Sequence, residues 1–249
     1  MSFIETLRQR IFGDVFDEFD SRESYVVPNI EDEITELTGN ESCVMTGFAP
    51  RRVNLNVITV ADSHGKLRRD DIMNPLHTGN LPDAVFLLGD NFVSDLETVL
   101  DIVPESIPIY GVVGNHDQKD LLADFPRIKN VNGICTAPKS IADDYTIAGL
   151  SGSIRYKNDD YYAMLTNEES EQAMSRIPYA DILLAHDKPC FSTPERLTSH
   201  SGLTGIGKYI LERKPKIVLH GHLHERYAKR LGGTVIRCCY GVEKFPIAF

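Results

Sequence analysis

Histidine, aspartate and asparagine side chains recur at the ends of short apolar runs in this chain. In one such stretch, VLHGHLHER at residues 218–226, three histidines occupy alternate positions. The polar positions that follow apolar runs are Asp62, His64, Asp90, Asn115, His116, Asp117, His186, His222 and His224. Five of the eight histidines of the sequence are among them. Buried imidazoles and carboxylates need partners, and divalent metal ions provide such partners, so the pattern indicates a metal centre.

The types of candidate ligand restrict the metal. Neutral imidazoles mixed with carboxylates and an amide oxygen suit Mn²⁺, Fe²⁺, Co²⁺ or Zn²⁺ better than an all-oxygen ion such as Ca²⁺. No cysteine is among the candidates, so a structural zinc site is not expected. The candidate ligands are too many for one catalytic ion that keeps coordination positions open for water or substrate. Two ions that share one carboxylate would use all of these ligands. Two ions about 3.5–4 Å apart can hold an oxyanion and generate hydroxide near neutral pH, which is the chemistry of phosphoester cleavage.

Buried strands are the elements expected to position these residues. From Val53 onward, short apolar runs end in polar loops that contain glycine, namely VNLNVITVADSHG, DAVFLLGDN, IPIYGVVGNHD, YTIAGLSGS, ADILLAHDKP and KIVLHGHLH. Helical patterns lie between several of them, at residues 93–103, 166–177 and 203–214. Alternating strands and helices predict an α/β domain that binds ligands beyond the carboxyl ends of its strands. Residues 225–241 instead predict a β-hairpin around Gly232 and Gly233.

The first 50 residues differ from the rest in charge. They hold eleven Asp/Glu and three Lys/Arg, a balance of −8 within the net −10 of the 249-residue chain. Apolar residues at helical spacing over residues 3–19, and a second short helical pattern in IEDEITEL, predict an acidic helical appendage or cap. We therefore divide the chain into this appendage, residues 1–50, and a main domain, residues 51–249.

Composition favours a soluble, cytoplasmic protein. The five cysteines show no paired metal-ligand spacing and are odd in number, which is typical of reduced thiols in the cytosol. No signal-like start and no apolar segment of membrane-spanning length is present, so no membrane interaction is expected. The chain has no long basic tract, which disfavours nucleic acid as a partner. The apolar face of the first helical pattern offers a contact surface for an oligomer.

Five short motifs follow one another in order: DSH at 62–64, GDN at 89–91, GNHD at 114–117, AHDKP at 185–189 and GHLH at 221–224. In this order they resemble the calcineurin-like metallophosphoesterase superfamily, whose motifs are D-x-H, G-D, G-N-H-[DE], a lone His and G-H-x-H. The resemblance covers residues 53 to about 240. It implies an α/β fold, a four-layer α-β-β-α sandwich with mixed sheets, and identifies residues 51–249 as the catalytic domain.

The resemblance also implies a role for each matching residue. Two metal ions would share Asp90 as a bridging ligand. The other ligands of the first ion would be Asp62, His64 and His224. The other ligands of the second ion would be Asn115, His186 and His222. His116 would bind no metal; it would stabilise the phosphoryl oxygens or protonate the leaving group, a task that suits its ordinary pKa.

Charge counting agrees with an anionic substrate. Two divalent ions contribute +4, the carboxylates of Asp62 and Asp90 contribute −2, and a bridging hydroxide contributes −1. The centre therefore keeps a charge of about +1 within an acidic protein and attracts phosphate without a basic surface patch.

The chain departs from the protein Ser/Thr phosphatases of this superfamily. Their longer second motif, G-D-x-V-D-R-G, has an aspartate and an arginine where this chain has Val93 and Ser94, and Val113 replaces the arginine before the third motif. We therefore do not expect a protein phosphatase. Asp95 or Asp117 could orient His116, although Asp95 also fits an exposed acid at a helix start.

Three further residues are candidate substrate contacts. Asn91 either contacts a substrate oxygen or shapes the turn after Asp90. Arg155 either reaches a phosphate or is an ordinary surface arginine. His200 either reaches the phosphate or occupies a loop or helix-cap position. Two other histidines are not expected to be ligands: His77 fits the surface, and His220 fits a packed position at the end of an apolar run.

These expectations together describe a hydrolase. It would use two divalent ions, first of all Mn²⁺ with Fe, Zn, Co or Ni as alternatives, and cleave phosphomonoesters or phosphodiesters by metal-bound hydroxide. Its substrate would be a small phosphorylated compound or nucleotide. One alternative is a nuclease for single-stranded nucleic acid, but the arginine pairs at 51–52 and 68–69 are too small to establish a basic groove. The other is a non-catalytic scaffold of the same fold, which would not need to retain every ligand.

Overall fold

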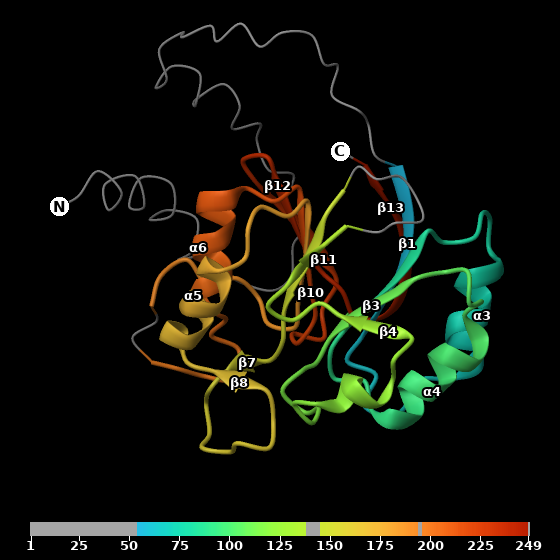
Figure 1. Ribbon diagram of the computed structural model, residues 1–249, viewed down its shortest axis with the longest axis horizontal. Coiled ribbons are helices and arrows are strands. Elements are labelled where there is room, and N and C mark those ends of the chain that lie inside the picture. The colour runs from blue at the N-terminus through green and yellow to red at the C-terminus, as the bar shows by residue number, and fades with distance from the viewer. Residues whose placement is uncertain (1–53, 138–144, 194–195, 249) are drawn as a thin grey trace, which may run out of the picture. The chain divides into compact units, whose positions relative to one another are not determined.

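A computed structural model describes residues 54–137, 145–193 and 196–248 (Figure 1). In this part of the chain two mixed β-sheets pack face to face, and a pair of helices covers the outer face of each. The arrangement is the four-layer α-β-β-α sandwich that the sequence predicts. The expected helical appendage, residues 1–50, lies outside the described residues.

The first sheet has five strands in the order β13-β1-β2-β3-β4. Four are parallel, and only β13, at the edge, runs antiparallel to its neighbour. Its strands are β1 (Asn54–Ala61), β2 (Ala84–Leu88), β3 (Ile109–Val112), β4 (Ile128–Asn130) and β13 (Gly241–Ala248). The helices on its outer face are α3 (Arg69–His77) and α4 (Val93–Ile102), followed along the chain by a short 3-10 helix, η1 (Leu121–Asp124).

The second sheet has six strands in the order β11-β12-β10-β9-β6-β5, with the four central strands parallel and an antiparallel strand at each edge. Its strands are β5 (Cys135–Thr136), β6 (Ile147–Leu150), β9 (Ile182–Ala185), β10 (Ile217–His220), β11 (Tyr227–Leu231) and β12 (Thr234–Cys238). The helices on its outer face are α5 (Asn167–Ser175) and α6 (Thr204–Arg213). A small parallel pair consists of β7 (Ser153–Ile154) and β8 (Met164–Leu165).

Successive residues of the central strands point into different cores. Phe86 of β2 and Leu184 of β9 belong to the core between the two sheets, whereas their neighbours Leu87 and Leu183 pack under the helices. Both faces of each central strand are therefore buried, and this is why the strands read as continuous apolar runs in the sequence. The same packing places the carboxyl ends of both parallel sets at one edge of the sandwich.

The predicted elements are confirmed with small shifts at their ends. The six apolar runs form β1, β2, β3, β6, β9 and β10, the three helical patterns form α4, α5 and α6, and the hairpin forms β11 and β12. Two elements that the sequence did not predict each contain a proline, Pro75 in α3 and Pro246 in β13. Pro246 is tolerated because β13 is an edge strand, where a missing N–H need not break a ladder.

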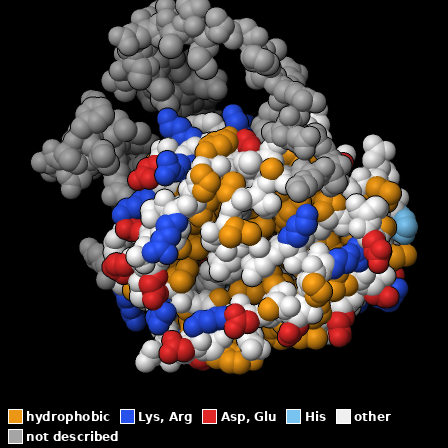
Figure 2. Space-filling view, viewed as in Figure 1, with side chains coloured by type: hydrophobic (Ala, Val, Ile, Leu, Met, Phe, Trp, Pro, Cys, Tyr) orange, Lys and Arg blue, Asp and Glu red, His pale blue; other side chains and the backbone are white. Residues whose placement is uncertain are grey.

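On the face shown in Figure 2, Lys and Arg side chains are interleaved with Asp and Glu side chains. No continuous basic surface is seen on that face. Within the described ranges, the structure contains no helix with the length and apolar character needed to cross a membrane.

Lys244 of β13 connects the two elements that contain proline. Its Nζ donates to the carbonyl oxygens of Pro75, Thr78 and Asn80 at 2.9, 2.6 and 2.6 Å, and so caps the C-terminal end of α3. We expect Lys244→Met to lower the free energy of unfolding by about 1 kcal/mol, because carbonyls at this end lose a charged donor. Urea unfolding measures the change. Lys119→Met, at an exposed lysine, is the charge-matched control, and an equal loss in both variants would contradict the capping role.

Candidate metal centre

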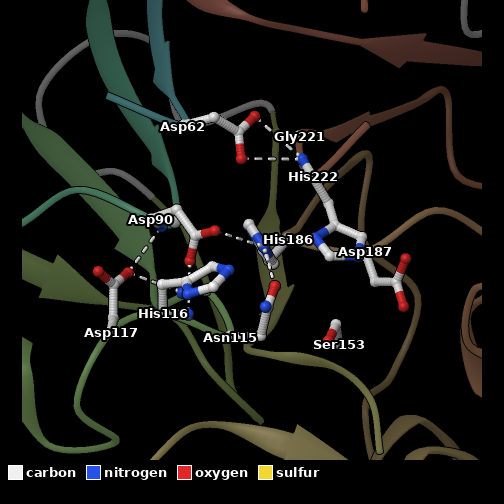
Figure 3. A network of polar contacts seen from close by, with 12 residues as sticks. Asp62, Asp90, Asn115, His116, Asp117, Ser153, His186, Asp187, Gly221 and His222 are labelled. Carbon is white, nitrogen blue, oxygen red and sulfur yellow. Dashed lines mark hydrogen bonds and ion pairs between the residues drawn. The ribbon is translucent and has the colours of Figure 1, made fainter. Parts of the chain in front are cut away.

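The polar residues singled out in the sequence lie in loops at the carboxyl ends of parallel strands. Asp62 and His64 follow β1, Asp90 follows β2, and Asn115 and His116 follow β3, all in the first sheet. From the second sheet, His186 follows β9, and His222 and His224 follow β10. Because the two sheets face each other, loops from both meet, and Figure 3 shows the side chains of Asp90, Asn115 and His186 pointing toward one another.

Asp62, His64 and His224 form the first ligand group. One ligand atom from each lies within 4.8 Å of those of the other two. The Nε2 atoms of His64 and His224 are only 3.2 Å apart, and His224 Nε2 is 3.9 Å from Asp62 Oδ1. Two imidazole nitrogens and a carboxylate oxygen thus converge on one small volume.

Asp90, His186 and His222 form the second ligand group, with the same 4.8 Å limit on their ligand atoms. His186 Nε2 lies 3.5 Å from Asp90 Oδ2 and 2.9 Å from Asn115 Oδ1 (Figure 3). The other ring nitrogen, Nδ1, lies 2.8 Å from the carbonyl oxygen of Leu88, to which a neutral imidazole donates. Burial acts to lower the pKa of His186, but the carboxylates of Asp90 and Asp62 outweigh it, so the pKa lies above its usual value and a protonated Nε2 can donate to the two oxygens. A divalent ion at this position would replace that proton.

Asp90 joins the two groups through a single oxygen. Its Oδ2 is 3.8 Å from His64 Nε2 in the first group and 3.5 Å from His186 Nε2 in the second. Its Oδ1 accepts a hydrogen bond from the backbone N–H of His116 at 2.8 Å. Potential ligand atoms from both groups therefore converge on one buried carboxylate, an arrangement that fits divalent cations and the mixed nitrogen and oxygen donor set.

The pKa values of several side chains favour the protonation states in which they can bind a metal ion. Burial lowers the pKa of His222 to about 3 and lowers the pKa of His64, so both imidazoles are neutral at pH 7. Burial acts to raise the pKa of Asp90, but His186 and the backbone N–H of His116 outweigh it, and the pKa lies below its usual value. The pKa of Asp62 is raised to about 6, chiefly by burial; His186 opposes this effect and Asp90 adds to it. Asp90 is therefore the most persistent anion of the cluster.

The backbone at the cluster is strained. Among the described residues, six non-glycine positions have the left-handed conformation, and five of them are candidate ligands: Asp62, His64, Asp90, His222 and His224. This conformation costs about 1–2 kcal/mol for a residue with a Cβ. Such strain persists only where surrounding contacts impose it, and it clusters at functional sites.

Two buried carboxylates hold the ligand loops. Asp95 Oδ2 accepts from the backbone N–H groups of Gly65 and Phe92 at 2.7 and 3.0 Å, and its Oδ1 accepts from Leu67 at 3.0 Å. Asp117 Oδ2 accepts from the backbone N–H groups of Asp90 and Gly114 at 2.7 and 2.8 Å. Within the described ranges neither carboxylate forms a hydrogen bond with the His116 ring, so the orienting role considered for them stays a prediction.

The alternative interpretation of Asp95, an exposed acid at a helix start, is wrong, because only 1% of this residue is exposed. Asp95 is the third residue of α4 and accepts from the N–H of the cap residue Phe92. Its place three residues after the cap was the sequence signal for this role. Nothing in the sequence signals its further bonds to the loop that carries His64.

Two glycines make room for the carboxylates. A Cβ on Gly114 would lie 2.1 Å from Asp90 Oδ1, and a Cβ on Gly221 would lie 2.8 Å from Asp62 Oδ2. Both separations are far below van der Waals contact, so the glycines in the third and fifth motifs are sterically required for the observed ligand positions.

The three candidate substrate contacts lie in different surroundings. Asn91 is buried, and its Nδ2 donates to the carbonyl oxygen of Gly89 at 3.1 Å, which supports the turn-shaping alternative. Arg155 donates to Glu169 Oε2 at 3.2 Å and to the carbonyl of Met164 at 3.1 Å, so its guanidinium is engaged with protein acceptors. His200 is exposed in the loop before α6, and its ring centroid lies 4.9 Å from that of His222. Of the three, His200 is in direct contact with a candidate ligand.

The two remaining histidines have the surroundings that the sequence predicts. His77 is exposed at the end of α3. His220 is fully buried with its Nε2 3.3 Å from the hydroxyl of Tyr227, and burial lowers its pKa to about 4. His220 is a packed neutral residue and belongs to neither ligand group.

Asp117 gives the metal-free protein a specific pH dependence. Burial raises its pKa to about 7, and Asp90 adds to the effect. Between its ordinary value near 4 and this value, the carboxyl is protonated when folded and ionised when unfolded, so the free energy of unfolding falls as pH rises through this window. We compare the free energy of unfolding of Asp117→Asn with that of the wild type at each pH. We expect this difference to shift in favour of the variant by about 1–2 kcal/mol as the pH rises from about 5.5 to about 8.

Urea unfolding in EDTA at the two pH values measures this difference. Asp71→Asn is the control, because Asp71 pairs with Arg68 at the surface and its pKa lies below its usual value, outside the window. A difference between Asp117→Asn and the wild type that is the same at both pH values would contradict the account.

Comparisons with known proteins agree on the fold. The structure is similar to TT1561 of Thermus thermophilus, with a TM-score of 0.57 and 17% identity over 78% of this chain and 99% of that chain. It is also similar to phosphopantetheinyl hydrolase from Mycobacterium tuberculosis, with a TM-score of 0.52 and 12% identity over 75% of this chain and 89% of that chain. A search of curated proteins gave no significant match.

Residues 55–238 match the family model of the calcineurin-like phosphoesterase superfamily domain. The matched range begins in β1 and ends in β12, so it includes all the candidate ligands and, apart from β13, the strands of both sheets. Nothing in the comparisons indicates the protein Ser/Thr phosphatase branch, which agrees with the departures at Val93, Ser94 and Val113. The chain therefore belongs to the calcineurin-like phosphoesterase superfamily.

Proposed function

We propose that the chain is a hydrolase of phosphomonoesters or phosphodiesters that binds two divalent ions, one in each ligand group. The observation that carries the proposal is the position of Asp90 Oδ2, within 4 Å of a nitrogen from each group. A carboxylate oxygen between two groups of potential ligand atoms is suited to bridge two cations. Family membership supports the reaction class, since the superfamily is one of phosphoesterases.

The ligand groups suit first-row divalent ions. Asp62, His64 and His224 would hold the first ion, Asn115, His186 and His222 the second, and Asp90 both. Mn²⁺ is our first choice because the set mixes carboxylate and amide oxygens with imidazoles. When bound, the ions supply charge for the phosphoryl oxygens and lower the pKa of the attacking water.

In this proposal His116 handles the proton of the leaving group. Its side chain is exposed, and its ring centroid lies 5.3 Å from that of His64, beside the first ligand group. The backbone N–H of His116 is tied to Asp90 Oδ1, so the carboxylate at the centre also fixes the position of this residue. As the P–O bond breaks, protonated His116 would donate its proton to the departing oxygen.

His200 is a further contact in this proposal. Its exposed ring packs against His222, on the side of the second ligand group. From there an imidazole N–H can donate to a phosphoryl oxygen. We propose a small phosphorylated compound or nucleotide as substrate, because the centre attracts phosphate through its ions and needs no basic groove.

Two variants separate chemistry from metal binding. With Mn²⁺, the protein should cleave p-nitrophenyl phosphate or bis(p-nitrophenyl) phosphate, and EDTA should abolish the activity. We expect His116→Ala to lower kcat by about 10²–10⁴-fold while isothermal titration calorimetry still shows two bound Mn²⁺. Asp90→Asn should lose both activity and tight Mn²⁺ binding, because both ions lose a charged ligand.

His77→Ala, which removes an exposed histidine at the end of α3, is the control for general effects of histidine loss. Full activity in His116→Ala, or two tightly bound Mn²⁺ in Asp90→Asn, would refute the roles assigned to these residues.

A further inference from the structure

Two exposed aromatic side chains lie beside the first ligand group. Among the described residues, the large aromatic side chains that are exposed belong to Phe92, Tyr156, Tyr161, Tyr179 and Tyr240. Phe92 packs against His64, and Tyr240 packs against His224. Exposed aromatic area is unfavourable in water, so its concentration at a candidate active site points to a ligand that covers it.

Phe92 and Tyr240 are the two ends of a row of four rings. The ring centroids of Phe92 and His64 are 5.9 Å apart and nearly perpendicular. Those of His64 and His224 are 5.3 Å apart, and the ring of Tyr240 is stacked on His224 at 5.1 Å and 21°. Phe92 and Tyr240 are 40% and 39% exposed, so each keeps a free surface beside the ligands.

Both residues are held by their backbones. One oxygen of buried Asp95 accepts from the N–H groups of Phe92 and Gly65, and the Phe92 ring lies over Gly65, where a Cβ would come 3.2 Å from Cδ2. The carbonyl of Tyr240 accepts from Arg226 Nε at 2.9 Å, and its N–H donates to Glu243 at 3.1 Å. Aromatic rings on a fixed backbone lose little conformational entropy when they bind a ligand.

We propose that Phe92 and Tyr240, here called the aromatic rim, form a stacking surface for a planar aromatic leaving group of the phosphoester. This inference rests on the proposed function and deepens it by naming the class of substrate. The phosphoryl group would lie at the ligand groups, and the leaving group would extend over the rings beside the first group. A nucleobase and an aryl group share this planar chemistry.

The competing role for these rings is to position His64 and His224 without touching substrate. Two matched pairs of substrates separate the roles: phenyl phosphate with cyclohexyl phosphate, and adenosine 5′-monophosphate with ribose 5-phosphate. The first pair reports stacking of an aryl group, and the second reports stacking of a nucleobase. The variants are Phe92→Leu and Tyr240→Leu. The control is Tyr179→Leu, because Tyr179 is 43% exposed and lies before β9, at the opposite end of that strand from His186.

We expect at least one rim variant to lower kcat/KM about tenfold for the aromatic member of a pair, because the loss of one stacked ring has an effect of this size. The value of kcat/KM for the non-aromatic member should not change. Tyr179→Leu should leave both pairs unchanged. Equal losses for both members of each pair, together with weaker Mn²⁺ binding by calorimetry, would overturn the proposal and show that the rings only position the ligands. The proposal would also be overturned if both rim variants kept the wild-type ratio of kcat/KM between the aromatic and the non-aromatic member of each pair.

A binding experiment keeps this test separate from the proposed function. Adenosine and phenol carry no phosphate, and their binding to the Zn²⁺-loaded protein can be followed by saturation-transfer NMR. Binding that weakens in a rim variant but not in Tyr179→Leu would support the rim even in a protein that cleaves no ester. If neither compound binds the wild-type protein, or if binding is the same in all variants, the rim proposal fails while the phosphoesterase proposal stands on its own assays.

Discussion

The constraint on which this structure depends is the electrostatics around the carboxylate of Asp90. It is almost fully buried, and imidazole nitrogens from both sheets approach the same oxygen at 3.8 and 3.5 Å. Acidic groups this close together need positive charge between them, which a protonated His186 supplies in the metal-free chain and bound cations would supply more fully. Burial raises the pKa values of Asp62 and Asp117 in the metal-free chain, and the charge of Asp90 acts in the same direction.

The fold provides the rigidity that such crowding requires. Parallel strands of two sheets end at one edge, and the left-handed residues turn the side chains inward just beyond those ends. Asp95 and Asp117, each buried and bonded to backbone N–H groups, hold the loops that carry His64 and Asp90. Strain and buried charge are thus confined to the loops, while the cores on either side of each sheet are apolar.

The candidate ligands could be singled out from the sequence because each combines a residue type with a place at a strand end, and the resemblance to the superfamily divided them into two groups. The sequence did not predict α3 or β13, because Pro75 and Pro246 argue against a helix and a strand. The edge position of β13 and the contacts of Lys244 with the end of α3 are tertiary features. The sequence could not separate the alternatives for Arg155 or Asp95, since both depend on tertiary partners. The aromatic rim has no sequence signal, because an aromatic residue near a strand end resembles a core residue until its exposure is known.

The central claim is that one oxygen of Asp90 lies between two cations. Anomalous diffraction from crystals grown with Mn²⁺ tests it most directly. The account predicts two anomalous peaks about 3.5–4 Å apart on either side of Asp90, one beside His64 and His224 and the other beside His186 and His222. A single peak, or two peaks that do not share Asp90, would contradict it.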